Sequence, residues 1–270
     1  MTVGFKRPGE IVDNACTIGK TKSEESIPRL LVLGFLAGAY IAFGGTVAIA
    51  TGKGITADGF GGLSKLIFGA TFPVGLILVV IAGSELFTGN VGVITPSCLS
   101  GRAKWLGLLK NWVFVYIGNF IGSLFVAYFL GYLSKLFAAD PYLKGVTGIA
   151  EAKVHAGFWP IFWRGIGCNW LVCLGVWLGI SANDIAGKVL GIWFPIMAFV
   201  AIGFEHSVAN MFFVPLGLFY GANATWGQFI LNNLIPSTLG NIVGGGLFVG
   251  TIYWWLYGRQ TTPSPAPQTK

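Results

Sequence analysis

The stretches 83-GSELFTGN-90 and 203-GFEHSVAN-210 share the pattern G-x-E-x-x-x-x-N, about 120 residues apart. Each interrupts a long apolar segment with a carboxylate, a group that is costly inside a hydrocarbon layer. A second matched pair, 118-GNFIG-122 and 240-GNIVG-244, recurs at a similar separation. Two matched pairs in the same order indicate that the chain consists of two related halves. The alternative interpretation is that the interruptions are ordinary glycine-containing kinks.

The composition indicates that both halves lie in a membrane. Of the 270 residues, 54% are hydrophobic and only 10% are charged, whereas soluble domains carry about 25% charged residues. The apolar segments are long enough for bilayer-crossing helices, and none alternates as a strand of a membrane barrel would. The net charge of +7 is spread thinly along the chain, which argues against a nucleic-acid surface. We therefore expect an all-α membrane protein.

Six apolar spans are predicted, and the second and fifth contain the two interruptions. Since each half holds three spans, an odd number, the second half must enter the membrane upside down, which gives an inverted 3+3 repeat. Broken helices at matched positions predict a permeation site near the middle of the bilayer, because unwound backbone is tolerated there only where it lines a cavity or is buried. The spans are 30–50, 63–98, 106–136, 157–182, 188–220 and 227–257.

The distribution of basic residues predicts the orientation. With both termini in the cytoplasm, 11 of the 17 Lys and Arg residues lie inside, as the positive-inside rule favours. The six others, on the outside, are Lys53, Lys65, Lys135, Lys144, Lys153 and Arg164. No cleavable signal peptide is visible. We expect a cytoplasmic N-terminal segment over 1–29, a transmembrane channel domain over 30–257, and a Pro-rich, disordered cytoplasmic tail over 258–270, in the cytoplasmic (plasma) membrane.

Four stretches of the sequence resemble the formate/nitrite transporter family. They are 83-GSELFTGN-90, 168-CNWLVCLGVW-177, 203-GFEHSVANMFFVP-215 and 236-PSTLGNIVGGGLFVG-250. The resemblance covers nearly the whole chain and implies an aquaporin-like fold of six helices, with helices 2 and 5 broken, assembled as a homopentamer with one pore per protomer. The Asn-Pro-Ala motif of aquaporins is absent, so a water or neutral-solute channel is the weaker alternative.

The resemblance assigns pore roles to five residues. His206 is similar to the pore histidine, whose imidazole can change charge near neutral pH, and Thr88 on the opposite broken helix resembles its hydrogen-bonding partner. Lys153 resembles the outer vestibule lysine, which would raise the local concentration of anions. Asn169 and Asn241 resemble polar residues that line the pore, for which interhelical hydrogen bonding is an equal alternative.

Apolar residues are expected to narrow the pore on either side of the histidine. Hydrophobic rings of this kind exclude water and hydrated ions. The resemblance places Phe72, Leu76, Phe87 and Phe199 at these constrictions. Packing against lipid or neighbouring helices is the alternative for each of them.

The polar residues repeated in the two interruptions are interpreted as structural. On a helix Glu205 would point about 100° away from His206, and a pathway lined by bare carboxylates would repel anions. We therefore expect Glu85 and Glu205 to hold the breaks open by accepting hydrogen bonds from backbone N–H groups or from asparagines such as Asn90 and Asn210.

These features predict a channel or transporter for small monovalent weak-acid anions, gated by pH or coupled to protons through the pore histidine. Formate is favoured, nitrite is the first alternative, and hydrosulfide and short monocarboxylates stay open. The two histidines form no HExxH motif and the four cysteines no CxxC motif, so neither an enzyme nor a metal site is expected. The expected partners are the anion, the lipid bilayer and other copies of the chain, without cofactor or nucleic acid.

Overall fold

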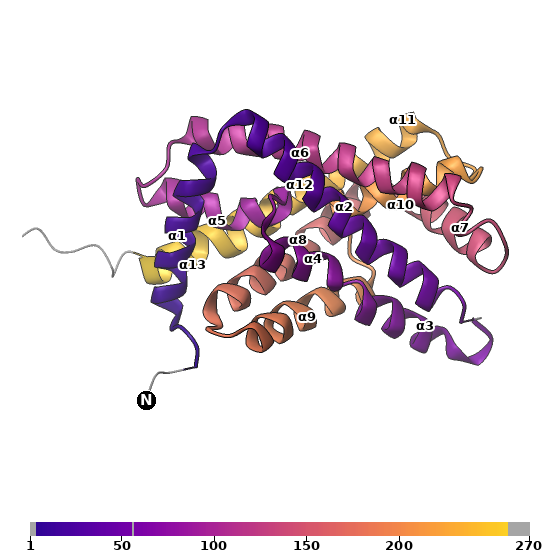
Figure 1. Cartoon of the computed structure of the whole chain (residues 1–270), viewed down its shortest axis with the longest axis horizontal. Helices are drawn as coiled ribbons and strands as arrows, with labels where there is room; N and C mark the ends of the chain where they lie inside the picture. The colour runs from indigo at the N-terminus through magenta and orange to yellow at the C-terminus, as the bar shows by residue number, and fades with distance from the viewer. Residues whose placement is uncertain (1–3, 56, 259–270) are drawn as a thin grey trace, which may run out of the picture.

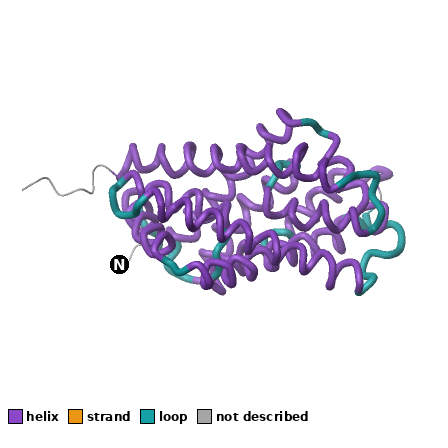
Figure 2. Tube along the Cα trace, turned by 90° about the horizontal axis from the view of Figure 1, so that it is seen from above, coloured by secondary structure: helices purple, strands orange, loops and turns teal. Residues whose placement is uncertain are grey.

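Helices account for almost all of the chain in the computed structural model, which describes residues 4–55 and 57–258. The only strand-like pairing in this part of the chain is an isolated bridge between Phe5 and Ala182. Figure 2 shows the loops mainly at the two ends of the bundle, with short non-helical stretches in its interior. Except for Gly258, the tail expected to be disordered lies outside the described residues.

Six helical segments are long and apolar enough to cross a membrane, which confirms the predicted all-α fold. The first half contains α1 (Pro8–Glu24), α2 (Ile27–Gly52), α3 (Ala57–Thr71), α4 (Val74–Leu78), α5 (Phe87–Leu99) and α6 (Trp105–Phe125). The second half contains α7 (Tyr142–His155), α8 (Phe158–Ser181), α9 (Ile185–Ile202), α10 (Ser207–Phe219), α11 (Trp226–Gln228), α12 (Ile235–Ile242) and α13 (Ile252–Tyr257). The spans are Ile27–Gly52, Gly62–Gly83, Trp105–Leu133, Phe158–Ser181, Ile185–Ile202 and Trp226–Tyr257.

The spans run along the long axis of the molecule (Figure 1). Helix α1 lies across one end, beside α13, while α7 and α11 lie at the other end. The described N-terminal and C-terminal segments therefore meet at the same end, as an even number of spans requires. Helix α7 was not predicted, because its 14 residues are too short and too polar to register among apolar spans.

Glycines at matched positions create the two breaks. Gly83 and Gly203 have φ values of +85° and +89°, a left-handed conformation that ends a helix and that glycine adopts without strain. The backbone is extended at Ser84 in the first break, and at Leu86 and His206, the residues that cap α5 and α10. Each broken span is thus two half-helices whose ends meet inside the bundle.

Other glycines let the helices of each half pack closely. Gly38 and Gly122 lie between α2 and α6, where an added Cβ would overlap backbone carbonyl groups of the facing helix. Gly240 and Gly244 repeat this contact against α8 in the second half. Small residues at such contacts replace the hydrophobic driving force that lipid does not supply. The close contacts hold the unbroken helices as a scaffold for the half-helices.

Candidate functional site

Thr88 and His206 meet in the interior of the bundle. Thr88 lies in the first turn of α5, and His206 caps α10. Oγ1 of Thr88 lies 2.8 Å from Nε2 of His206, and both residues are buried. The inverted repeat thus brings together two side chains that are 118 residues apart in the sequence.

The backbone of α10 fixes the tautomer of His206. The N–H group of Ala209 donates to Nδ1 at 3.0 Å, so the neutral imidazole carries its proton on Nε2. This Nε2–H then donates to the hydroxyl of Thr88. A second proton would have to bind Nδ1 and replace the bond to Ala209. Protonation of the imidazole is therefore coupled to the first turn of α10.

Helix α8 holds the carbonyl group of Thr88. Nδ2 of Asn169 donates to this oxygen at 3.1 Å, and Sγ of Cys173 donates to it at 3.4 Å. The same Asn169 amide donates to the carbonyl oxygen of Asn241 at 2.7 Å. Asn169 therefore joins three helices and fixes the height of Thr88 in the bundle.

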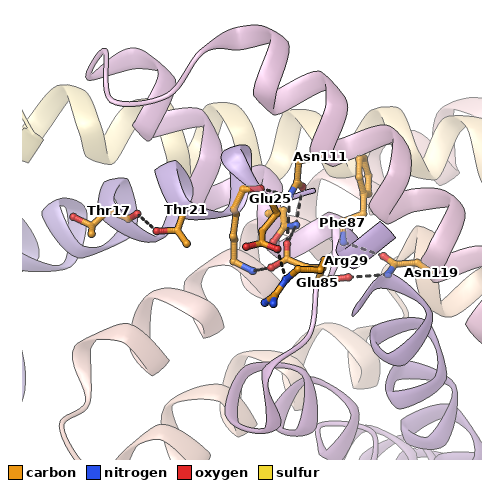
Figure 3. Close-up of polar contacts among 10 residues, drawn as sticks. Thr17, Thr21, Glu25, Arg29, Glu85, Phe87, Asn111 and Asn119 are labelled. Carbon is orange, nitrogen blue, oxygen red and sulfur yellow. Dashed lines mark hydrogen bonds and ion pairs between the residues drawn. The ribbon is translucent and has the colours of Figure 1, made fainter. Parts of the chain in front are cut away.

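A buried polar network surrounds Glu85 in the first break (Figure 3). Nζ of Lys22 lies 2.6 Å from Oε1 of Glu85, and Nδ2 of Asn90 donates to Oε2 at 2.6 Å. Asn111 of α6 donates to Oε2 at 3.4 Å and accepts a bond of 2.8 Å from Asn90. The carboxylate is thus held by one cation and two amides.

The second break contains the same network around Glu205. Nζ of Lys153 lies 2.8 Å from Oε2 of Glu205, and Nδ2 of Asn210 donates to this oxygen at 2.7 Å. Asn233 donates to it at 3.3 Å. Lys153 was expected to collect anions, but its ammonium group is committed to this carboxylate. The lysine, the glutamate and two asparagines therefore form a unit that occurs once in each half.

Two further asparagines bond the backbone at each break. Oδ1 of Asn119 accepts from the N–H group of Phe87 at 2.9 Å, and its Nδ2 donates to the carbonyl oxygen of Glu85. Asn241 does the same for Ser207 and Glu205. The backbone N–H groups that the sequence assigned to the glutamates thus bond to these amides. Asn241 supports the break and lines neither of the cavities described below.

The sequence did not predict four members of these networks, which are Lys22, Asn111, Asn119 and Asn233. Lys22 and Lys153 are 131 positions apart, whereas the glutamates are 120 apart, because the first half has a longer connection before its break. When the two halves of the sequence are compared at the separation that aligns the glutamates, the two lysines are therefore not aligned. The GN pairs at 118 and 240 were a usable indication of Asn119, since Asn241 had already been singled out.

A cavity of about 540 Å³ opens on the side of His206, and we call it the histidine-side cavity. His206, Phe72 and Phe199 line its inner part. The charged residues of its wall are Lys53, Lys65, Lys153, Arg164 and Glu205. Four cations face one carboxylate, so the described wall of this cavity is strongly positive.

A cavity of about 380 Å³ lies on the other side of the break region. Leu86, the repeat counterpart of His206, lines it, so we call it the leucine-side cavity. Its charged wall residues are Lys22, Arg29 and Glu85. Both cavities carry more positive than negative charge, which favours anions over cations.

Apolar side chains separate the two cavities. Phe72 and Phe199 line the histidine-side cavity with their ring centres 6.0 Å apart, and Leu76 lines the leucine-side cavity. All three are at least 97% buried. Phe87 instead packs on Trp112 and Tyr116 and lines neither cavity.

The side chains that commonly bind metal ions are scattered over the described part of the chain. Within residues 4–55 and 57–258, no group of three or more His, Cys, Asp or Glu side chains is placed to hold a metal ion. All four cysteines are buried and free. The geometry instead consists of two positive cavities, an apolar barrier and one imidazole between them.

Comparison with known proteins agrees with this geometry. The sequence model of the formate/nitrite transporter family matches residues 9–255. The chain is 50% identical to a probable formate transporter of Methanothermobacter thermautotrophicus, over 95% of this chain and 99% of the relative. It is 35% identical to the formate channel FocA of Escherichia coli K12, over 94% and 95% of the two chains.

Solved structures agree in fold. A pentameric formate channel with formate bound superposes with a TM-score of 0.74 at 36% identity, covering 86% of this chain and 97% of that one. An ion channel of the same family gives a TM-score of 0.79 at 32% identity, over 92% and 98% of the chains. The matches in sequence and in fold both extend over almost the full chain. The protein therefore belongs to the formate/nitrite transporter family.

Proposed function

We propose that the protein is a passive, proton-sensitive channel for small monovalent weak-acid anions, with formate as its preferred cargo. The hydrogen bond between Thr88 and His206 carries this proposal, because it lies at the apolar barrier between two positive cavities. The names of the relatives and of the formate-bound structure support formate as the cargo.

In the proposed mechanism, the positive cavities attract the anion, and Thr88 and His206 control its passage through the apolar barrier. The lysine partners of Glu85 and Glu205 neutralise the two carboxylates, so neither repels an incoming anion. At the barrier the anion loses water and meets the polar edge formed by Thr88 and His206. A proton taken up from water at Nδ1 makes the imidazolium, which attracts the anion and hands it the proton of Nε2. The neutral acid then crosses between Phe72 and Leu76, while water removes the proton left on Nδ1 and returns one to Nε2, so that Nδ1 again accepts from Ala209. Where the imidazole stays neutral, the anion crosses unprotonated and carries current.

We further propose the setting in which this channel works. Both termini lie in the cytoplasm, the host bilayer is the plasma membrane, and five copies assemble with one pore each. The pentamer of the formate-bound neighbour supports the last point. Exposed apolar side chains on α6, such as Leu109, Val113 and Ile117, offer a face for lipid or a second copy. Native mass spectrometry of the detergent-solubilised protein measures the number of copies.

Uptake of radiolabelled formate into proteoliposomes, measured across a pH series with nitrite, acetate and hydrosulfide as competitors, tests the proposed function. We expect saturable formate uptake that rises as the pH falls. His206→Ala should abolish this pH dependence, and Thr88→Val, which leaves Nε2–H without an acceptor, should slow uptake at least about tenfold. Thr88→Ser keeps the hydroxyl and serves as the matched control. Unchanged rate and pH dependence in His206→Ala would rule the mechanism out, and stronger competition by nitrite would change the assigned cargo.

A further inference from the structure

The histidine-side cavity contains cations that the Thr88–His206 site does not use. The ammonium group of Lys153 bonds to Glu205, so this pair contributes little net charge. Lys53, Lys65 and Arg164 remain, and Glu205 is the only acidic residue among the described residues of the wall. Three positive charges without an acidic partner in the described wall raise the local concentration of anions in this cavity.

The internal repeat shows that Arg164 is a difference between the halves. The carbonyl oxygen of Arg164 accepts the N–H group of Glu205 at 3.3 Å, and that of Leu33 accepts the N–H group of Glu85 at 3.2 Å. The two residues hold the same place in the scaffold, and each lines the cavity of its own half. The guanidinium group therefore replaces an apolar side chain and is not required by the fold.

The other cavity has no equivalent free guanidinium group. Its arginine, Arg29, lies 2.5 Å from a carboxylate oxygen of Glu25 in an i,i+4 pair. Among the described residues, the side chain of Arg164 has no hydrogen bond or ion pair with any protein group. A guanidinium group of this kind can bind both oxygens of a carboxylate at once.

Lys53 connects the wall of the cavity to the barrier. Its ammonium group lies 5.8 Å from the ring centre of Phe68, and this ring is 5.8 Å from that of Phe213. Phe213 stacks on the barrier residue Phe72 at 6.2 Å. Burial and the like charge of Lys65 lower the pKa of Lys53, as expected for a cation without a carboxylate partner. The positive wall therefore extends along an aromatic surface to the barrier.

We infer that Arg164, with Lys53 and Lys65, forms a receiving site for planar monovalent anions with two oxygens, separate from Lys153 and in front of the His206 barrier. Arg164 grips both oxygens, and the two lysines supply attraction over a longer range. This inference rests on the proposed function, since it assumes that such anions enter this cavity. Beyond the proposed function, it states that the Arg164 site helps to decide which anion is bound first and from which side of the membrane.

Formate currents through single channels in planar bilayers test the inference, because each channel has one orientation and formate can be added to either compartment. Arg164→Leu places the residue of the repeat counterpart at this position. It should raise the half-saturating formate concentration at least about tenfold from one side, the loss expected for a charge-assisted hydrogen bond, and leave the other side unchanged. Arg164→Lys keeps the charge without the planar, two-pronged guanidinium group and should give an intermediate value for formate.

Lys135→Gln is the matched control, because this exposed lysine precedes α7 and lines neither cavity. It should leave half-saturation unchanged from both sides. The inference is overturned if Arg164→Leu conducts formate with unchanged half-saturation, or if its effect equals that of Lys135→Gln. If Arg164→Leu does not fold, Arg164→Lys decides by the same criterion. A wild-type protein that gives neither formate current in bilayers nor formate uptake into proteoliposomes would contradict the proposed function instead.

Discussion

The two buried lysine–glutamate pairs carry a desolvation cost. The side chains of Lys153 and Glu205 are 16% and 5% exposed, and those of Lys22 and Glu85 are 21% and 8% exposed. Desolvation of such groups is compensated only if the geometry is good and the remaining hydrogen-bonding positions are filled. The asparagines fill these positions, which explains why each pair occurs together with two amides.

Removal of one partner should therefore be far more damaging than removal of both. We expect Lys153→Met to lower the free energy of unfolding by about 3–5 kcal/mol, because it leaves Glu205 buried without a cation. The double variant Lys153→Met with Glu205→Gln should cost clearly less than the sum of the single changes. Thermal unfolding of the wild type, the two single variants and the double variant in detergent measures the coupling free energy between Lys153 and Glu205.

The exposed pair of Lys144 and Asp140 provides the control for this cycle. Their side chains are 82% and 48% exposed, and solvent screens such pairs. The corresponding variants Lys144→Met and Asp140→Asn should show no measurable coupling. Additive effects at Lys153 and Glu205 would contradict the structural role given to the pair.

The sequence identified His206 and Thr88 through the family resemblance, and the structure places them in contact. It did not identify the partner of Glu85, because Lys22 lies on a surface helix that a search for apolar spans ignores. Long-range pairing of this kind depends on how α1 folds back onto α5, and no local pattern encodes that contact.

Among the helical elements, those with long apolar stretches were predictable. All six spans and both breaks were expected. A span can be recognised from the length of its apolar run, and a break from a glycine next to a polar residue within that run. The short helix α7 was not, and neither were the π-helical segments such as Val126–Leu133 and Val243–Thr251. Those segments depend on how a span adapts to its neighbours and have no evident sequence pattern.

The close packing of α2 against α6 gives a prediction for these elements. Gly122→Ala places a methyl group against the carbonyl oxygen of Phe35, and we expect a loss of about 1–3 kcal/mol in unfolding free energy. Gly148→Ala is the control, because this exposed glycine of α7 has open space around its Cβ position. It should be neutral or slightly stabilising, by up to about 1 kcal/mol, owing to helix propensity. A similar melting temperature for both variants would show that α2 and α6 accommodate the added methyl group without loss of stability, which would contradict the prediction.

For the molecule as a whole, the inverted halves place α1 and α13 at one end and α7 at the other (Figure 1). This arrangement fixes which segments share a side of the membrane, whereas the absolute orientation follows only from the charge bias. Lys53, Lys135 and Lys144 lie on segments at the α7 end, away from α1. The distribution of basic residues therefore predicts the topology with both termini in the cytoplasm.

Reporter fusions test this topology. Green fluorescent protein attached at the C-terminus should fluoresce, because that end is expected in the cytoplasm. Alkaline phosphatase inserted between Leu133 and Tyr142, the ends of a span and of α7, should be active only if this loop lies outside. The reciprocal fusions are the controls and should be silent. Active phosphatase at the C-terminus would reverse the assignment.

The unequal walls of the two cavities also bear on the electrical behaviour of the pore. Arg164 is the repeat counterpart of Leu33, and His206 is the repeat counterpart of Leu86. The fixed positive charge is therefore greater in the histidine-side cavity than in the leucine-side cavity. A passive pore cannot choose the direction of net transport, which the gradients decide. A pore with asymmetric fixed charge can nevertheless rectify, passing more anion current at one sign of the applied voltage than at the other. The cavity-wall positions at which the halves differ, such as Leu33 and Arg164, would then decide at which sign of voltage the current is larger.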